Sequence, residues 1–575
     1  MTAEKAKKAG MAEMASAADA DGVVWLAINA KYSHTSLSVR YLREAVPGSR
    51  ILEVTINDYL LPTLGAVYEM HPRVLGIACY IWNIERVKEL LQLLPAALPG
   101  CTVICGGPEV SYETAAFMKA FPMVDYVVRG EGEEAIAALC ERLRVGESGA
   151  GIPGVAWRGP DGTVHEGAAV VVPELSALPF PYHEEEMADI RERILYYETS
   201  RGCPFSCAYC LSCATAGVRY LPLPRVLREL AFFVRHDVRQ VKFVDRTFNA
   251  KKAHFLPILT YIAGLPETCR TNFHFEVAID YLDDEVLGVL SRMPSGRVQL
   301  EIGIQSTNAA TLAAVSRVNH WAKIASHIRT ILGFHNMHLH VDLIIGLPGE
   351  GVASFHQSFI DVFALQPDAL QLGFLKFLKG AAMMGIVERY GYQYMTMAPY
   401  EVLRSDALTY GEIRWLHTFE DVFERYYNAG RCRTATAWLT RQFMGGDAFA
   451  FWQRLADWWE ARGFHRRNHA VRKLYAYLLA FAKSLGAGEE DLVRLDALLR
   501  WDAIRKEGVK SFPEGLGWRR EWRDRVLVEV FPCDIQKLIE GEEVEETEVS
   551  ISCASLTEGR GPRSGGGSVG GRPWH

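Results

Sequence analysis

The chain has little of what marks a secreted, membrane-embedded or nucleic-acid-binding protein. Its twelve cysteines are spread unevenly over 575 residues, without the dense regular spacing of a disulfide framework. The sequence contains no apolar run long enough to span a bilayer, and its Ala/Lys-rich start lacks the apolar core of a secretory signal. A net charge of −7 gives no general reason to expect nucleic acid or an anionic membrane as a partner, although it is compatible with a local basic channel. Together these absences predict a cytoplasmic protein.

Length and composition predict several folded domains. A chain of 575 residues exceeds one ordinary hydrophobic core, and 49% hydrophobic with 23% charged residues is typical of a folded protein. The sequence pattern divides the chain into a disordered leader (1–22), a first α/β domain (23–150), a hairpin and linker (151–193), a second strand–helix series (194–384), a helical domain whose aromatic stripe we interpret as core (385–540) and a disordered tail (541–575).

Both strand–helix series predict parallel β-sheets. In the first, short apolar strands such as VVWLAINA and VLGIACYIWN alternate with helices, which is typical of a doubly wound, Rossmann-like sheet. The second contains six strand-like runs separated by helix-sized segments. Six units are fewer than the eight of a closed barrel and predict an open, partial (β/α)6 barrel. In both architectures ligands bind beyond the carboxyl ends of the strands.

The most informative segment is ETSRGCPFSCAYCLSC, which places Cys203, Cys207 and Cys210 in one short loop. Thiolates are soft ligands that suit iron–sulfur clusters or zinc. An ordinary tetrahedral site takes four protein ligands, whereas C-x-x-x-C-x-x-C supplies three and leaves one iron of a [4Fe-4S] cluster open to a substrate. A four-thiolate zinc or ferredoxin-like site that includes Cys213 is the alternative. We interpret Cys213 as a packing residue or a substrate-side group.

The cysteine motif, with Tyr209 just before its last cysteine, resembles the signature of radical S-adenosylmethionine enzymes. The resemblance implies that the open iron is chelated by the methionyl amino and carboxylate groups, and that an electron from the cluster cleaves the sulfonium to a 5′-deoxyadenosyl radical. Polar residues at the ends of the following strands are candidates to bind S-adenosylmethionine. For Asp245, a local ion pair with Arg246 is an equal alternative. For Glu301, a purely structural role is the weaker alternative. The candidates are Asp245, Glu276, Glu301, Gln305 and Gly346.

An α/β sheet that precedes such a barrel resembles a cobalamin-binding domain. The motifs NAKYSHTSLSVRYL, GGPEVSYE, GEGEE, VKFVDRTFN and DLIIGLPGE together resemble an uncharacterised branch of the cobalamin-binding radical S-adenosylmethionine family that carries its own helical carboxyl-terminal domain. For Gly106 and Gly107, the alternative to a contact with cobalamin is a plain turn. For Glu109 and Glu131, the alternative is capping of the helix that follows. The residues predicted to contact cobalamin follow strands of the first sheet: His34, Tyr80, Trp82, Gly106, Gly107, Glu109, Gly130 and Glu131.

One departure from a common cobalamin motif concerns His34. Many cobalamin proteins carry D-x-H-x-x-G after the first strand, and its histidine ligates cobalt; residues 29–35 do not match it. His34 is close to the expected place, but a lone loop histidine is more often a hydrogen-bonding group. Several radical methylases of the family similarly lack the motif. The departure therefore weakens a histidine-ligated cobalt without removing cobalamin.

The resemblance implies a methyltransferase that uses S-adenosylmethionine twice, once to methylate cobalt and once to form the radical that removes hydrogen from an unreactive carbon. A cobalamin-dependent rearrangement or oxidation without methyl transfer, and a non-enzymatic cobalamin or redox sensor, are the alternatives. A methylthiotransferase would need a second cluster, and the sequence has no second grouped cysteine triad. We expect a small-molecule or peptide substrate, reduced flavodoxin or ferredoxin as electron donor, no nucleic acid and no membrane span. The sequence identifies no catalytic general base.

Overall fold

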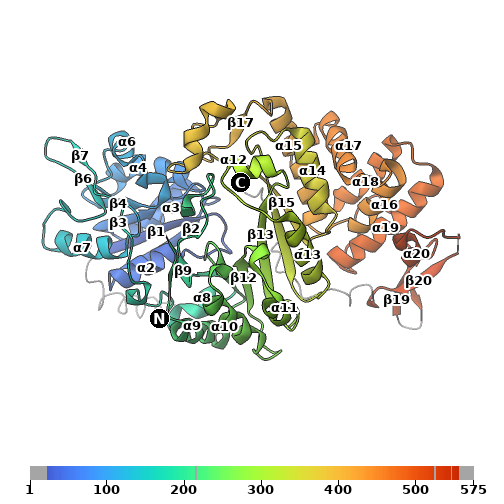
Figure 1. Ribbon diagram of the computed structural model, residues 1–575, viewed down its shortest axis with the longest axis horizontal. Helices are drawn as coiled ribbons and strands as arrows, with labels where there is room; N and C mark the ends of the chain where they lie inside the picture. The colour runs from blue at the N-terminus through green and yellow to red at the C-terminus, as the bar shows by residue number, and fades with distance from the viewer. Residues whose placement is uncertain (1–21, 214–216, 524–525, 546, 556–575) are drawn as a thin grey trace, which may run out of the picture.

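The protein consists of three parts that lie side by side along its long axis (Figure 1). The computed structural model describes residues 22–213, 217–523, 526–545 and 547–555. An α/β domain (blue) is followed by a second α/β part (green) and a mainly helical part (orange to red). The predicted leader up to residue 21 and the predicted tail from residue 556 lie outside the described residues. Within the described ranges, no helix has both the length and the apolar character needed to cross a membrane.

The amino-terminal part is a seven-stranded sheet in the order β2-β1-β3-β4-β5-β6-β7. Strands β1 to β5 pair in parallel, and β1 is buried along its whole length, as expected for an apolar strand covered on both faces. The doubly wound prediction is confirmed. The predicted hairpin is present as β6 and β7, but it extends this same sheet antiparallel to β5 and so belongs to the domain. The elements are β1 (Val23–Asn29), α2 (Leu37–Ala45), β2 (Arg50–Thr55), α3 (Leu60–Glu69), β3 (Val74–Ala78), α4 (Ile84–Ala97), β4 (Thr102–Gly106), α5 (Pro108–Ser111), α6 (Thr114–Ala120), β5 (Tyr126–Val128), α7 (Glu133–Arg144), β6 (Val155–Arg158) and β7 (Val164–His165).

The central part is an open sheet of six parallel strands in the order β15-β14-β13-β12-β11-β8, which confirms the predicted partial barrel. Residues of β13 and β14 alternate strictly between buried and half-buried, because one face packs on the helices and the other is polar. The elements are β8 (Ile194–Tyr197), β9 (Ser200–Arg201), β10 (Arg219–Tyr220), α9 (Leu223–Arg235), β11 (Gln240–Phe243), α10 (Lys252–Ala263), β12 (Asn272–Glu276), α11 (Asp284–Leu290), β13 (Val298–Gln305), α12 (Ala309–Ala314), α13 (Trp321–Leu332), β14 (His338–Ile345), α14 (Val352–Phe363) and β15 (Ala369–Phe374).

The carboxyl-terminal part is built on helices whose aromatic residues form the core, with Trp452, Trp459 and Tyr475 fully buried. Two features differ from the sequence prediction. A three-stranded antiparallel sheet, β18-β19-β20, joins the helices, and β20 lies inside the segment predicted to be a disordered tail. This strand is ordered because it pairs with β19, a long-range contact that local composition does not reveal. The elements are β16 (Gln393–Tyr394), β17 (Val402–Arg404), α15 (Tyr410–Phe423), α16 (Arg433–Met444), α17 (Ala448–Ala461), α18 (Val471–Ser484), α19 (Glu489–Glu507), β18 (Arg520–Arg523), β19 (Val526–Phe531), α20 (Ile535–Glu540) and β20 (Val549–Ser552).

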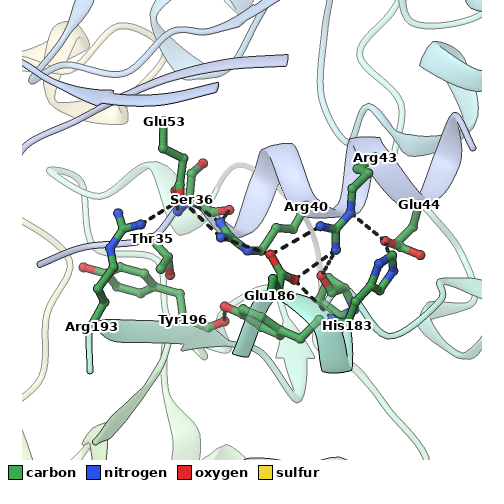
Figure 2. A network of polar contacts seen from close by, with 12 residues as sticks. Thr35, Ser36, Arg40, Arg43, Glu44, Glu53, His183, Glu186, Arg193 and Tyr196 are labelled. Atoms are coloured by element: carbon green, nitrogen blue, oxygen red, sulfur yellow. Dashed lines mark hydrogen bonds and ion pairs between the residues drawn. The ribbon is translucent and has the colours of Figure 1, made fainter. Parts of the chain in front are cut away.

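A buried carboxylate, Glu53 on β2, joins the first domain to the segment that leads into the barrel (Figure 2). Its oxygens accept hydrogen bonds from both terminal nitrogens of Arg40, at 3.1 Å each, and from Arg193 at 3.0 Å. The backbone N–H of Ser36 donates to the same carboxylate at 2.6 Å. Arg40 is only 2% exposed and also lies 3.4 Å from Glu186, so the first sheet and the linker share one ion-pair network.

We expect Glu53→Gln to lower the free energy of unfolding by about 3 kcal/mol, because it leaves the buried Arg40 guanidinium without its main counter-charge. Chemical denaturation followed by circular dichroism measures this change. The matched control is Glu89→Gln, which removes one partner of the surface pair with Arg86 and is expected to cost at most about 0.5 kcal/mol. Equal decreases in the free energy of unfolding in the two variants would contradict the conclusion that the Glu53 network stabilises the fold more than a surface pair does.

Candidate functional site

The three motif cysteines lie in a loop that leaves the carboxyl end of β8 through β9 and returns through β10. The two short strands pair antiparallel, with Arg201 opposite Arg219, so they close the base of this cysteine loop. Gly202 has φ +103°, and a Cβ there would lie 2.1 Å from the carbonyl oxygen of Gly217. Only glycine fits between the two sides of the loop at this point. The loop therefore begins at the edge of the sheet where the parallel strands end, as predicted.

The thiols of the cysteine loop suit an iron–sulfur cluster. Cys203, Cys207 and Cys210 are free thiols, and the first and last are partly accessible. Cys203 Sγ lies 3.5 Å from Thr247 Oγ1, and Cys210 Sγ accepts from the backbone N–H of Ser212 at 3.4 Å. In the described part of the chain no three His, Cys, Asp or Glu side chains gather as they would around a single metal ion. Three thiols in one short loop, two of them partly accessible, are ligands of the kind that bind a [4Fe-4S] cluster.

Arg317, which the sequence analysis missed, lies against the cysteine loop. Its Nη1 is 3.7 Å from Cys207 Sγ and 3.3 Å from the Tyr209 hydroxyl, and its Nη2 donates to the carbonyl oxygen of Gly303. Burial disfavours the charged guanidinium, but neighbouring Tyr209 and Cys207 outweigh it and raise the pKa of Arg317. The side chain therefore brings a permanent positive charge to the edge of the cluster site. Its signal in the sequence was only an arginine after β13, in AVSRVNH.

Asp245 organises the segment that precedes the cysteine loop. It accepts from the Thr199 backbone N–H at 2.8 Å, from Thr199 Oγ1 at 2.6 Å and from Ser200 Oγ at 2.5 Å. The residue is 1% exposed, and burial raises its pKa to about 6. The Asp245 carboxylate therefore binds the β8–β9 connection and does not pair with Arg246, and its contact with S-adenosylmethionine stays a prediction.

Glu276 and Glu301 lie opposite each other on β12 and β13 but differ in charge environment. Glu301 lies 2.9 Å from Lys242 and 2.9 Å from His274. Burial opposes its ionisation, but these two neighbours outweigh burial and hold its pKa below the ordinary value. Burial and the charge of Glu301 raise the pKa of Glu276 to about 7. Glu301 is thus held as a carboxylate by protein partners, and Glu276 is the one poised to gain or lose a proton near neutrality.

Gln305 and Gly346, the remaining candidates for S-adenosylmethionine, end β13 and follow β14. Gln305 has φ +70°, a rare conformation for a residue with a side chain, and its amide lies 2.3 Å from where a Cβ of Gly303 would be. Gly303 thus makes room for the Gln305 side chain. Gly346 has φ +91°, and a Cβ there would lie 2.9 Å from Val402 on β17. The structure brings Gln305 toward the strand ends near Arg317, whereas Gly346 is explained by packing on β17.

The aromatic pair after β3 is the part of the first domain best suited to a flat ligand. The rings of Tyr80 and Trp82 are stacked, with centroids 4.4 Å apart and planes 6° from parallel. Trp82 donates to the carbonyl oxygen of Ile28 at 3.2 Å, which fixes it at the carboxyl edge of β1, yet 40% of the residue is exposed. An exposed, rigid aromatic face at a strand-end edge is able to hold a large planar group such as a corrin.

His34, the candidate cobalt ligand, connects the two α/β parts. Its Nδ1 lies 2.5 Å from the hydroxyl of Tyr196 on β8, and its backbone forms a parallel bridge with Ile194. Burial, together with the charge of Lys31, lowers the pKa of His34 to about 4, so the ring is neutral at neutral pH. This contact gives the loop histidine the hydrogen-bonding role that the sequence analysis favoured over ligation.

Two of the three glycines predicted to contact the corrin, Gly107 and Gly130, lie against neighbouring backbone. Gly107 has φ +109°, and a Cβ would lie 2.4 Å from the Cys79 carbonyl oxygen. At Gly130, with φ +85°, a Cβ would lie 2.2 Å from the Val170 carbonyl oxygen. The added atom at Gly106 meets nothing closer than 3.5 Å. Gly106 therefore has space beside it, while the other two are glycines because backbone approaches them.

The two glutamates predicted to contact cobalamin are hydrogen-bonded to distant parts of the chain. Glu109 is 5% exposed and accepts a 2.6 Å hydrogen bond from the hydroxyl of Tyr400, before β17. Glu131 accepts from Arg219 at 2.5 Å and from Arg201 at 3.0 Å. The distant arginines and tyrosine could not be recognised as partners from the glutamates' own motifs.

Three families match successive parts of the chain. The B12 binding domain matches residues 23–140, the Radical SAM superfamily matches residues 197–361, and "Protein of unknown function (DUF4080)" matches residues 388–525. Each matched range lies within one of the three structural parts. They confirm the predicted cofactors: cobalamin for the first domain, and a [4Fe-4S] cluster with S-adenosylmethionine for the second.

Curated relatives match about half of the chain. A 2-(S-pantetheinyl)-carbapenam-3-carboxylate methyltransferase of Streptantibioticus cattleyicolor is 30% identical over 49% of this chain and 44% of its own length. The cobalamin-dependent radical SAM methyltransferase TokK of Streptomyces tokunonensis is 29% identical over 50% of this chain and 44% of its own length. The chain thus spans less than half the length of these relatives.

Solved structures share the fold. The radical S-adenosylmethionine methyltransferase TsrM of Kitasatospora setae, with cobalamin and a [4Fe-4S] cluster bound, superposes with a TM-score of 0.56 at 17% identity, over 68% of this chain and 82% of that one. The cobalamin-dependent S-adenosylmethionine radical enzyme OxsB has a TM-score of 0.56 at 13% identity, over 83% and 78%. The chain therefore combines a region that matches the B12 binding domain, a region that matches the Radical SAM superfamily and a DUF4080 region after the barrel.

Proposed function

We propose that the protein is a cobalamin-dependent radical S-adenosylmethionine methyltransferase that methylates an unactivated carbon. The observation that carries the proposal is the direct contact between the two cofactor-binding parts. Glu131, at a strand end of the B12-binding domain, is ion-paired with the arginines on both sides of the cysteine loop. Two domains joined in this way can present their cofactors to one substrate. The names of the relatives, which are methyltransferases, support the same reaction class.

The residues of the chain have separable roles in this proposal. Cys203, Cys207 and Cys210 hold the cluster, and the Arg317 guanidinium pairs with the methionyl carboxylate of S-adenosylmethionine. Glu276 and Gln305 supply polar groups to the rest of that molecule, and the Tyr80–Trp82 stack faces the corrin.

When bound, the cluster supplies the electron that cleaves S-adenosylmethionine, and cobalamin supplies the methyl group. For each methyl group transferred, one S-adenosylmethionine becomes S-adenosylhomocysteine and a second becomes methionine and 5′-deoxyadenosine. The 5′-deoxyadenosine carries the hydrogen removed from the substrate. Two electrons come from an external reductant, which we propose to be reduced flavodoxin or ferredoxin in the cytoplasm, and the substrate is a small molecule or peptide.

Anaerobically reconstituted protein supplied with dithionite, cobalamin and S-adenosylmethionine is expected to form 5′-deoxyadenosine, and Cys203→Ala is expected to abolish it because the cluster loses one of three ligands. Liquid chromatography with mass spectrometry measures the product. Cys269→Ala, which changes a half-buried thiol outside the motif, is the matched control. Undiminished 5′-deoxyadenosine in Cys203→Ala would contradict the cluster assignment, and retention of no corrin by the wild-type protein would exclude the methyltransferase.

Arg317→Lys is expected to raise the S-adenosylmethionine concentration for half-maximal 5′-deoxyadenosine formation about 10- to 100-fold. A change of this size is expected because the variant loses one hydrogen bond to a charged group. Lysine keeps the charge but not the two-pronged donor geometry. Iron and sulfide content should stay at the wild-type level, and Arg329→Lys, at an exposed site on α13, should leave the concentration dependence unchanged. A fall in iron content that accounts for the whole effect would mean that Arg317 supports Cys207 and does not bind S-adenosylmethionine.

A further inference from the structure

One carboxylate of the other domain, Glu131, bridges the two sides of the base of the cysteine loop. Arg201 directly precedes Gly202 and Cys203, and Arg219 lies opposite it on the returning strand β10. Both guanidinium groups reach Glu131, which follows β5 of the B12-binding domain. Arg201 Nη1 lies 3.0 Å from Glu131 Oε2, and Arg219 Nη2 lies 2.5 Å from Glu131 Oε1. One side chain therefore bridges the outgoing and the returning strand of the loop.

The bridge also fixes the strand-end loop from which Glu131 comes. The backbone N–H of Val172 donates to Glu131 Oε2 at 2.8 Å, and Arg219 donates to the Val172 carbonyl oxygen. The neighbouring Glu133, 8% exposed at the start of α7, lies 2.6 Å from Arg201 Nη2. The loop between β5 and α7, the linker and the base of the cysteine loop thus form one network of charge-assisted hydrogen bonds.

The charges of this network are largely removed from water. Side-chain exposure is 13% for Arg201, 18% for Glu131 and 22% for Arg219. Burial disfavours the Glu131 carboxylate, but the hydrogen bond from Arg219 and the charge of Arg201 outweigh burial and hold its pKa below the ordinary value. Partly buried, two-pronged arginine–carboxylate pairs are weak sources of net stability but define geometry well.

Both oxygens of Glu131 are occupied by protein donors. Three donors share Oε2 and Arg219 also donates to Oε1, so a contact to cobalamin, which the position of Glu131 in GEGEE suggests, would compete with the arginine pairs for the same carboxylate. The geometry favours a role in placing the loop over a role in binding the corrin.

We propose that Glu131 is a positioning residue: its bridge to Arg201 and Arg219 sets the spacing between the cluster held by the cysteine loop and the cobalamin held by the first domain. The inference rests on the proposed function, since it concerns the spacing of the two cofactors. It assigns Glu131 no contact with substrate or cofactor.

The test compares wild-type protein with Glu131→Gln, which keeps the shape of the side chain and removes its charge. Both are reconstituted with iron, sulfide and cobalamin and reduced until the reduced cluster and cob(II)alamin are present together. Pulsed electron double resonance then measures the distance distribution between the two paramagnetic centres. Glu134→Gln, at an exposed position in the first turn of α7, is the matched control.

Glu131→Gln is expected to bind cobalamin and assemble the cluster as the wild type does, but to give a broader or shifted distance distribution, while the control matches the wild type. An unchanged distribution in a variant that holds both cofactors overturns the proposal. A loss of cobalamin affinity with an unchanged distribution also overturns it and assigns Glu131 to the corrin.

A cofactor-free measurement separates this inference from the proposed function. Glu131→Gln, Arg219→Gln and the double variant are compared in thermal unfolding of the apoprotein, and the double variant should be no less stable than the less stable single variant, because both remove the same bridge. Additive losses of thermal stability in the double variant would contradict the bridge, and this outcome does not depend on cofactor binding. Failure of the wild-type protein to retain cobalamin, with non-additive losses in the apoprotein, would instead overturn the methyltransferase and leave the bridge as a link between domains only.

Discussion

Buried arginine–carboxylate pairs across the boundary between the two α/β parts are the interaction on which the rest of the structure depends. Glu53 binds Arg40 and Arg193 in one network (Figure 2), and Glu131 binds Arg201 and Arg219 in another. An apolar interface of the same size could be equally stable, but it would tolerate sliding. Paired charges in fixed geometry resist sliding, because a displaced pair leaves an uncompensated charge in a poorly hydrated place. The boundary is therefore built for alignment of two strand-end edges.

The third part of the chain is tied to the same edge. Tyr400 donates to Glu109 in the loop after β4, Lys379 lies 2.9 Å from Glu113, and a Cβ on Gly380 would overlap the ring of Tyr112. The segment that leaves the barrel after β15 thus touches the B12-binding domain before the DUF4080 helices begin. The carboxyl-terminal part is therefore joined to the B12-binding domain as well as to the barrel that precedes it.

Local pattern was enough to predict the sheets, and it failed where the partner of a residue is far along the chain. Apolar strands alternating with helices, and three cysteines in C-x-x-x-C-x-x-C, are local signals, and both predictions hold. Glu109 and Glu131 read as cofactor contacts because their motifs are local, whereas Tyr400 and Arg219 are 291 and 88 residues away. Arg317 was missed for the same reason, since Cys207 lies 110 residues before it. Strand β20 was predicted to be disordered because the sequence around it is acidic. Its pairing with β19 could not be recognised from that local composition.

One face of the second sheet carries a row of charged and polar side chains on neighbouring strands. Lys242, His274, Glu301, His340 and Asp342 lie on neighbouring strands, with Glu301 between Lys242 and His274 and His340 Nε2 3.2 Å from Asp342 Oδ1. The opposite face of the same strands contributes fully buried Ile304, Val341 and Leu343 to the apolar core. Replacing such a charged row by apolar residues of similar size would generally be neutral or stabilising. The row is therefore a departure from the apolar packing of the opposite face, and sequences generally keep such departures where function needs polar groups.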